Sequence, residues 1–219
     1  MNTRKSEGMI MPNKEVRMFA GLIERRADEK EQNIIEGVPI VFEQTTDLGW
    51  WDEVIDKNAL SETDLKDVRL LVNHDTDQLP LARSRNNNAN STMQMTVEED
   101  GLHIRATLDP ENPRAKEVLS AVSRQDVSGM SFMFSVDKDE WDDLESDHPT
   151  RRILSIGKVF EASIVTFPAY EQTEVYARAL ESVKDTLESE RKALESARKT
   201  EALRKAIRER SESLCTKKD

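Results

Sequence analysis

The alternation of apolar and polar residues is clearest between Gln125 and Val136. Neighbouring side chains there fall on opposite faces: Met130, Phe132 and Phe134 share one, and Ser131, Met133 and Ser135 share the other. This alternation predicts a half-buried β-strand. Ser131 follows Gly129, whose missing side chain lets nearby backbone N–H groups turn toward a ligand. Ser131 is therefore a candidate nucleophile, although a serine on a strand is usually structural.

Further strands are expected over residues 16–21, 33–42, 68–72, 92–97, 102–108, 151–157 and 158–167. The turn 98–101 ends in glycine and joins two of these strands, which predicts a β-hairpin. Val118, Leu119 and Val122 have helical spacing and predict a helix that begins at 109–113 and ends near Arg124.

Two polar residues stand out against apolar strands. His74 follows the continuous apolar run 68–72, which is typical of a strand buried on both faces. Such a histidine is either a site residue or a cap on the strand end. Glu161 lies in the middle of the strand 158–167, on the face expected to hold Val159, Ser163 and Val165. Because an unpaired buried carboxylate is costly, we expect Glu161 to have a hydrogen-bonded partner.

Other clusters favour structural roles. His103 lies on the polar face of the hairpin and is expected to be exposed to solvent, and His148 lies outside any ordered pattern. Residues 137–147 include seven acidic residues and one lysine. We expect a solvated loop there, with docking of a basic partner as the alternative. Trp50 and Trp51 are expected to pack, with contact to a substrate as the alternative.

The composition changes near Gln172, and the chain continues without glycine or proline to Leu214. This predicts one long charged helix. A heptad-like seam is formed by Leu180, Val183, Leu187 and Leu194, and Leu203 and Ile207 follow in a shifted register. The helix has the potential to form a coiled coil, and a solvated helix is the alternative.

Bulk properties narrow the class of protein. The 219 residues suffice for one sizeable domain and an appendage, and the net charge of −11 argues against a general nucleic-acid binder. No apolar run is long enough to span a membrane, and the first residues lack the apolar core of a secretory signal. The single cysteine, Cys215, excludes a disulfide framework within the chain and fits a reducing compartment. No metal-ligand spacing occurs, so we expect neither a metal nor a cofactor.

Three of these residues have the chemistry of a catalytic triad. A nucleophilic serine such as Ser131 needs a base, for which His74 is the candidate. The base needs an acid to fix its tautomer and to stabilise its charged form, and Glu161 is a candidate for that role. Backbone N–H groups at Gly129 and Met130 are candidate donors to the oxyanion.

At these residues the chain resembles the prohead (procapsid maturation) proteases of tailed bacteriophages, which are related to the herpesvirus assembly proteases. The matching segments are Asp52–Leu60, Leu70–Asp75, Asp100–Leu108, Asp126–Phe134 and Phe160–Tyr170. They occur in the order of the family and cover roughly residues 15–177. The Asn-His-Asp, Gly-Met-Ser-Phe and Glu-Ala-Ser-Ile-Val-Thr stretches together form a fairly specific signature.

The resemblance implies an α+β fold: a mainly antiparallel β-barrel core with flanking helices, followed by the long C-terminal helix. It implies a serine endopeptidase that cleaves scaffold and major capsid proteins, and itself, inside the immature capsid in the bacterial host cytoplasm. We expect a homo-oligomer that binds neither nucleic acid nor membrane.

Carried over to this sequence, the resemblance makes His74 the base, Ser131 the nucleophile and Glu161 the third member. Asp126 and Asp75 are rivals to Glu161. The herpesvirus relatives use a second histidine as third member and arginines just after it for the oxyanion. In this chain the strand of Glu161 offers no second histidine, and the first arginine after Glu161 is Arg178.

The expected organisation is a flexible segment 1–14, a protease domain 15–170 and a charged helical tail 171–219. We expect self-cleavage within the tail. The alternative function is a non-enzymatic scaffold or assembly protein of the same fold that acts through its helix. An esterase with the same triad is weaker, because the Gly-x-Ser-x-Gly elbow is absent.

Overall fold

The computed structural model describes residues 14–19, 23–25, 33–166 and 174–215. The expected domain boundary near residue 170 and nearly all of the segment 1–14 lie outside these ranges. The elements are β1 (Lys14–Phe19), β2 (Ile23–Arg25), β3 (Ile34–Val41), β4 (Thr46–Asp47), β5 (Asp52–Ile55), β6 (Arg69–Val72), β7 (Ala82–Arg83), a 3₁₀ turn (Arg85–Asn87), β8 (Met93–Val97), β9 (Gly101–Thr107), α1 (Pro113–Ser123), β10 (Gly129–Asp142), β11 (Thr150–Val165) and α2 (Glu174–Cys215). The α+β class, the hairpin β8–β9 and both helices are as predicted.

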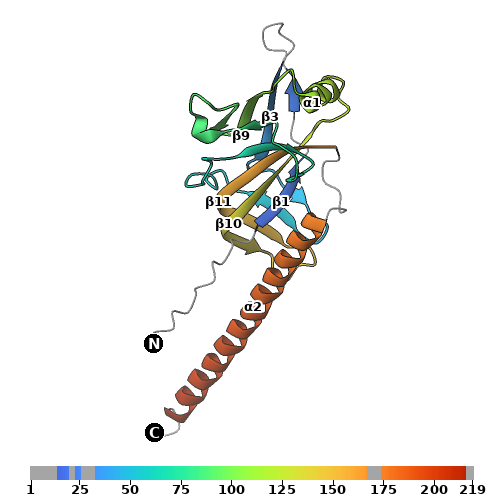
Figure 1. Cartoon of the computed structure of the whole chain (residues 1–219). Helices are drawn as coiled ribbons and strands as arrows, with labels where there is room; N and C mark the ends of the chain where they lie inside the picture. Colours follow the sequence, from blue (N-terminus) through green and yellow to red (C-terminus); the bar gives the residue numbers. More distant parts are fainter. Residues whose placement is uncertain (1–13, 20–22, 26–32, 167–173, 216–219) are drawn as a thin grey trace, which may run out of the picture.

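The larger sheet is built on two long antiparallel strands, β10 and β11, at the centre of the molecule (Figure 1). β1 pairs with β10. The other edge of β11 is shared by two short parallel strands, β5 along its beginning and β6 along its end. The ends of β6 and β11 therefore lie side by side, next to the beginning of β10. This corner of the sheet positions the candidate site.

The second sheet has the order β2-β3-β9-β8. Side chains of both sheets and of α1 form one core, in which Met130, Phe132 and Phe134 are fully buried. The side chain of Asn112 caps α1 by accepting a hydrogen bond from the Arg114 N–H, and Pro113 begins the helix. No closed barrel forms among the described strands, because β2, β4 and β8 each have a neighbour on one side only.

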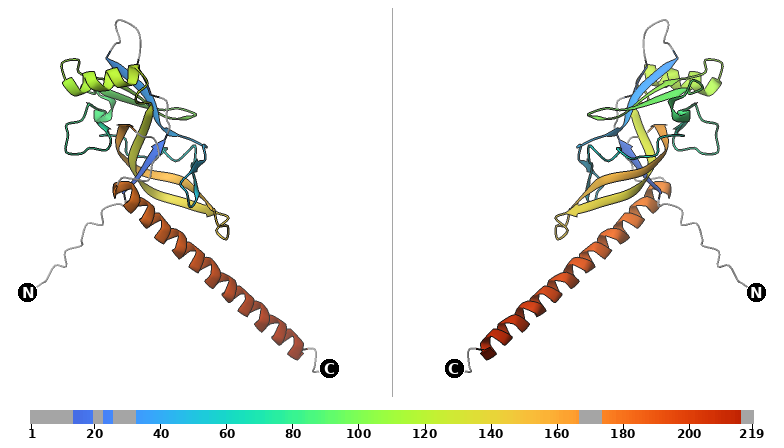
Figure 2. Two further views of the ribbon diagram at one scale, coloured as in Figure 1. Left: turned by 90° about the vertical axis from the view of Figure 1, so that its right-hand side faces the viewer. Right: turned by 90° about the vertical axis from the view of Figure 1, so that its left-hand side faces the viewer.

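Helix α2 projects away from the sheets as a rod, with its beginning held against the larger sheet (Figure 1, Figure 2). Val183 is buried against Leu48 and Trp51, and the Lys184 ammonium group lies 4.1 Å from the ring centroid of Trp50. Val183 of the predicted seam is therefore packed against the same chain and covers Trp51, which is buried as expected, whereas Trp50 is 60% exposed and contacts Lys184. Farther along, Leu203 and Ile207 are 63% and 60% exposed. Neither described helix has the long apolar stretch that a membrane span requires.

The acidic segment 137–147 is largely exposed, as predicted, but only its second part is a loop. Its first six residues continue β10, which ends at Asp142. The loop that follows contacts α2: Arg191 donates to the Leu144 and Ser146 carbonyls at 2.7 Å, and Arg198 bonds to Glu145. Among its acidic side chains, Glu145 thus pairs with Arg198 of α2, and Asp139 pairs with Arg151 of β11.

Two further expectations are corrected by the strand ladders. Residues 151–157 and 158–167 form one strand, β11, because β10 pairs along nearly its whole length. A bulge at Phe160 interrupts the alternation, since Met133 pairs with Glu161 but Phe134 pairs with Val159. Val159 therefore lies in the core instead of sharing a face with Glu161.

A buried ion cluster joins β1, β5, β10 and β11. Arg151 bonds to Glu15 at 2.7 and 3.0 Å, to Asp139 at 2.6 Å and to Glu53 at 3.2 Å. The Arg151 and Glu53 side chains are only 4% and 1% exposed. Burial alone lowers the pKa of the guanidinium, but its hydrogen bonds to Glu15 and the nearby carboxylate charges outweigh burial and raise the pKa. The cluster depends on its cation, because Arg151 supplies guanidinium donors to the buried carboxylates of Glu15 and Glu53.

Replacing Arg151 with methionine is expected to lower the free energy of unfolding by about 3 to 5 kcal/mol. The matched control is Arg152→Met, which removes the neighbouring and partly exposed ion pair with Glu43. That change should cost no more than about 1 kcal/mol. Urea unfolding of both variants measures the difference, and equal losses would contradict the account of the buried cluster.

Candidate functional site

The turn after β6 holds His74 in a left-handed conformation. Asn73 and His74 have φ values of 52° and 57°, which costs a non-glycine residue on the order of 1 kcal/mol or more. The Asp75 N–H closes the turn on the Val72 carbonyl at 3.1 Å. The Asn73 side chain fixes the turn to the end of β11, since it accepts from the Thr166 N–H at 2.9 Å and donates to the Thr166 hydroxyl at 3.1 Å.

The imidazole ring of His74 bonds to Glu161 near the end of β11. The distance from His74 Nδ1 to Glu161 Oε1 is 2.6 Å, and the two side chains are 9% and 4% exposed. The other carboxylate oxygen, Oε2, accepts a hydrogen bond of 2.6 Å from the Ser163 hydroxyl. These bonds supply the partners that a carboxylate at this buried position requires.

These contacts fix which nitrogen of His74 carries the proton. An ionised carboxylate only accepts hydrogen bonds, so Nδ1 must be the donor to Glu161. In the neutral ring, Nε2 then carries a free lone pair. Nε2 is buried and makes no hydrogen bond to the described part of the chain, Ser131 included. The arrangement therefore presents a buried base whose acceptor atom is unoccupied.

Ser131 lies on β10 beside this pair. It pairs directly with Ser163 across the β10–β11 ladder, and Met133 pairs with Glu161. Because directly paired residues share a face, Ser131, Ser163 and Glu161 lie on one face of the sheet, with paired Cβ atoms about 4.5 to 5.5 Å apart. Ser131 and Ser163 are both fully buried. Strand register thus places Ser131 on the same sheet face as Glu161, the partner of His74.

The rivals to Glu161 lie in other contacts. The carboxylate of Asp75 accepts from the Asp77 N–H at 3.1 Å, and Asp126 bonds to Arg124. The expected oxyanion donor Met130 pairs with Phe19 on one side and Ile164 on the other. Its main chain is therefore part of the ladder, and its N–H group lies in the plane of the sheet.

Ser163 and Asn73 were not singled out as site residues in the sequence. Ser163 had a visible signal, because it lies two residues after Glu161 and so on the same face of the strand. Asn73 had only its position before His74. The contacts of both residues depend on the pairing of β6 with β11, which the sequence does not reveal.

A cavity of about 300 Å³ lies between α1 and the ends of β6 and β11. Its lining is mostly aliphatic, with Arg114 and Glu117 among the polar residues. The aliphatic lining residues are Val72, Val118, Ala121, Val122, Val127 and Ile164. Asn73 and Thr166, which hold the His74 turn, also line it. The cavity is therefore adjacent to the candidate site.

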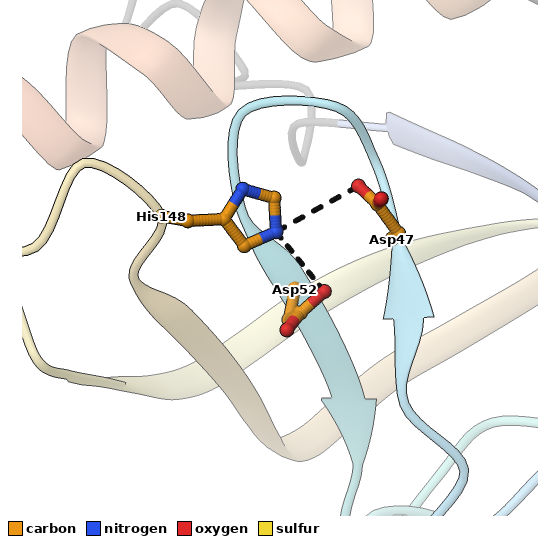
Figure 3. A group of neighbouring side chains, drawn as sticks. All are labelled: Asp47, Asp52 and His148. Atoms are coloured by element: carbon orange, nitrogen blue, oxygen red, sulfur yellow. Dashed lines mark hydrogen bonds and ion pairs between the residues drawn. The ribbon is translucent and has the colours of Figure 1, made fainter.

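The other two histidines bond to acids far from this site. His148 Nε2 lies 3.1 Å from Asp52 and 3.7 Å from Asp47, between the β4–β5 turn and the loop before β11 (Figure 3). His103, 32% exposed on the polar face of the hairpin, bonds through Nε2 to Asp100 at 2.7 Å, with Glu98 nearby. In the described ranges, these are the groups whose atoms could together hold a metal ion. Both are exposed to solvent, and the histidine–carboxylate bonds account for their geometry.

Two comparisons with known proteins gave matches. A family model described as the caudovirus prohead serine protease matches residues 22–187. The prohead protease of Enterobacteria phage HK97 is 32% identical over 163 residues, which cover 71% of this chain. The match spans 66% of that relative, just under two thirds of its length. No solved structure matches the chain. The matched range includes His74, Ser131 and Glu161.

The contacts predict opposite tautomers for the histidines. Neutral His74 should carry its proton on Nδ1, where Glu161 accepts it. His103 and His148 point Nε2 at carboxylates, so each should carry its proton on Nε2 and serve as an internal reference. Nitrogen-15 NMR of histidine-labelled protein distinguishes the two forms. An Nε2-protonated His74 would overturn the assignment of its free acceptor atom.

Proposed function

Because the chain belongs to the caudovirus prohead serine proteases, we propose that it is a serine endopeptidase of phage prohead maturation. Its substrates are the major capsid protein and the scaffold, and it cleaves them inside the immature shell. Ser131 is the nucleophile, His74 the general base and Glu161 the acid that orients the base. The observation that carries this proposal is the buried His74–Glu161 bond, which leaves Nε2 as a free acceptor on the sheet face of Ser131.

In the proposed reaction, His74 Nε2 takes the Ser131 proton as the serine oxygen attacks the carbonyl carbon of the substrate. The imidazolium that forms is stabilised by Glu161 through Nδ1. It returns the proton to the leaving amine as the peptide bond breaks, and water then hydrolyses the acyl-enzyme by the same route. Such hydrogen bonds are often long in a resting enzyme and tighten when substrate binds.

Access to the serine sets a condition on this reaction. Ser131 is fully buried, so a substrate reaches it only after the groups that cover this face have moved. The mostly aliphatic cavity beside the His74 turn offers a place for a side chain of the substrate. The proposed protease domain is 15–170.

The tail 171–219 belongs to the same proposal. Its exposed Leu203 and Ile207 offer a helical surface for scaffold or for a second copy of the chain. The enzyme also cleaves within this tail. A peptide must be extended to enter a protease site, so the cleaved part of the helix must unfold first.

Cleavage separates the enzyme from a non-enzymatic assembly protein of the same fold. The wild-type chain should lose its tail and cut the cognate capsid or scaffold protein, whereas Ser131→Ala and His74→Ala should stay intact and leave the substrate uncut. Mass spectrometry of the products after co-expression measures both events.

Two matched controls accompany this experiment. Ser135→Ala alters another buried serine of β10, and His103→Ala alters a histidine outside the site. Both should cleave like the wild type. If the wild type, Ser131→Ala and His74→Ala all remain full length and leave the cognate proteins uncut, the chain is not a protease.

A further inference from the structure

A second buried serine connects the main chain of His74 to Glu161. Ser163 is fully buried on β11, two residues after Glu161. Its hydroxyl oxygen accepts from the backbone N–H of His74 at 3.1 Å, and its proton is donated to Glu161 Oε2 at 2.6 Å. Together with the bond from His74 Nδ1 to Glu161 Oε1, these contacts close a ring of three hydrogen bonds.

We propose that Ser163 is a positioning residue that holds the base and its carboxylate in register for proton transfer. This inference rests on the proposed function of His74, Ser131 and Glu161. Ser163 touches neither substrate nor reacting atoms in this role. It acts on the geometry of His74, the base, and of Glu161, the acid that orients this base.

The ring constrains both partners. The carboxylate of Glu161 cannot rotate about its terminal bond without losing either Ser163 or His74, because each binds a different oxygen. The backbone of His74 is left-handed, which is unfavourable for this residue. The bond from its N–H to Ser163 is one of the contacts that keep it so. A single hydroxyl therefore fixes the backbone of the base and the orientation of the acid together.

The same contacts separate the roles of the two paired serines. Ser163 directs its only proton at Glu161, and its oxygen accepts from a main-chain N–H. The Ser163 hydroxyl therefore already makes one hydrogen bond to each residue of the His74–Glu161 pair. Ser131 lies opposite on β10, where its reaction with His74 Nε2 uses the atom that the ring leaves free.

A substitution series isolates the hydroxyl. Ser163→Ala removes one oxygen atom, and Ser163→Val and Ser163→Thr have nearly the same shape but differ in that hydroxyl. With the cognate capsid protein as substrate, the alanine and valine variants should lose about 10- to 100-fold in kcat, because a small misplacement of reacting groups has an effect of this size. KM should stay unchanged, and the threonine variant should recover most of the loss. Ser135→Ala is the control for removing a buried serine from the same sheet.

The outcomes are distinct. If folded Ser163→Ala, checked by a cooperative thermal transition, keeps the wild-type kcat, the positioning role is wrong. If threonine is no better than valine while both fold, the hydroxyl is not what matters, and the inference also fails. Failure of the proposed function looks different, since Ser131→Ala would then behave like the wild type, whether both cut the substrate or both leave it uncut. If valine and threonine fail to fold, the alanine variant decides.

Discussion

The cost of burying a carboxylate organises this corner of the molecule. Glu161 lies near the end of a core strand and is almost inaccessible to solvent. An ionised acid there requires a donor for each oxygen, and the chain supplies His74 from the end of β6 and Ser163 from β11. Because His74 must turn back over β11 to reach Glu161, its turn takes a left-handed backbone that Asn73 anchors to Thr166. The same bond sets the tautomer and leaves Nε2 free beside the strand of Ser131.

A second buried charged residue, Arg151, has a structural role at the beginning of β11. Arg151 forms ion pairs with acids from three other strands and so connects the beginning of β11 to β1, β5 and β10. Farther out, the exposed arginines of α2 hold the loop after β10. One strand therefore carries a structural ion cluster near its start and the candidate site near its end. The long helix is attached close to the structural end.

Much of this could be predicted from residues that break a local pattern. Glu161 places a charge among the apolar residues of a strand, His74 follows a continuous apolar run, and alternation located the strands of Ser131 and Glu161. The parallel pairing of β6 with β11 could not be predicted in this way, because strand register depends on contacts between residues far apart in sequence. The position of Ser163 between Glu161 and the His74 main chain follows from that register. The partners of the acidic run could not be predicted for the same reason, since Arg151 and Arg198 are supplied by other elements. The bulge at Phe160 has no local signal, and it moved Val159 into the core.

The central claim is that Ser131 is activated by His74. A fluorophosphonate reacts with an activated serine and stays bonded to it, so the labelled residue can be found by peptide mass spectrometry. If His74 activates Ser131, protein that cleaves its cognate capsid substrate should carry the label on Ser131, and His74→Ala should lose that label. Label on a different serine, or equal labelling of Ser131 with and without His74, would contradict it.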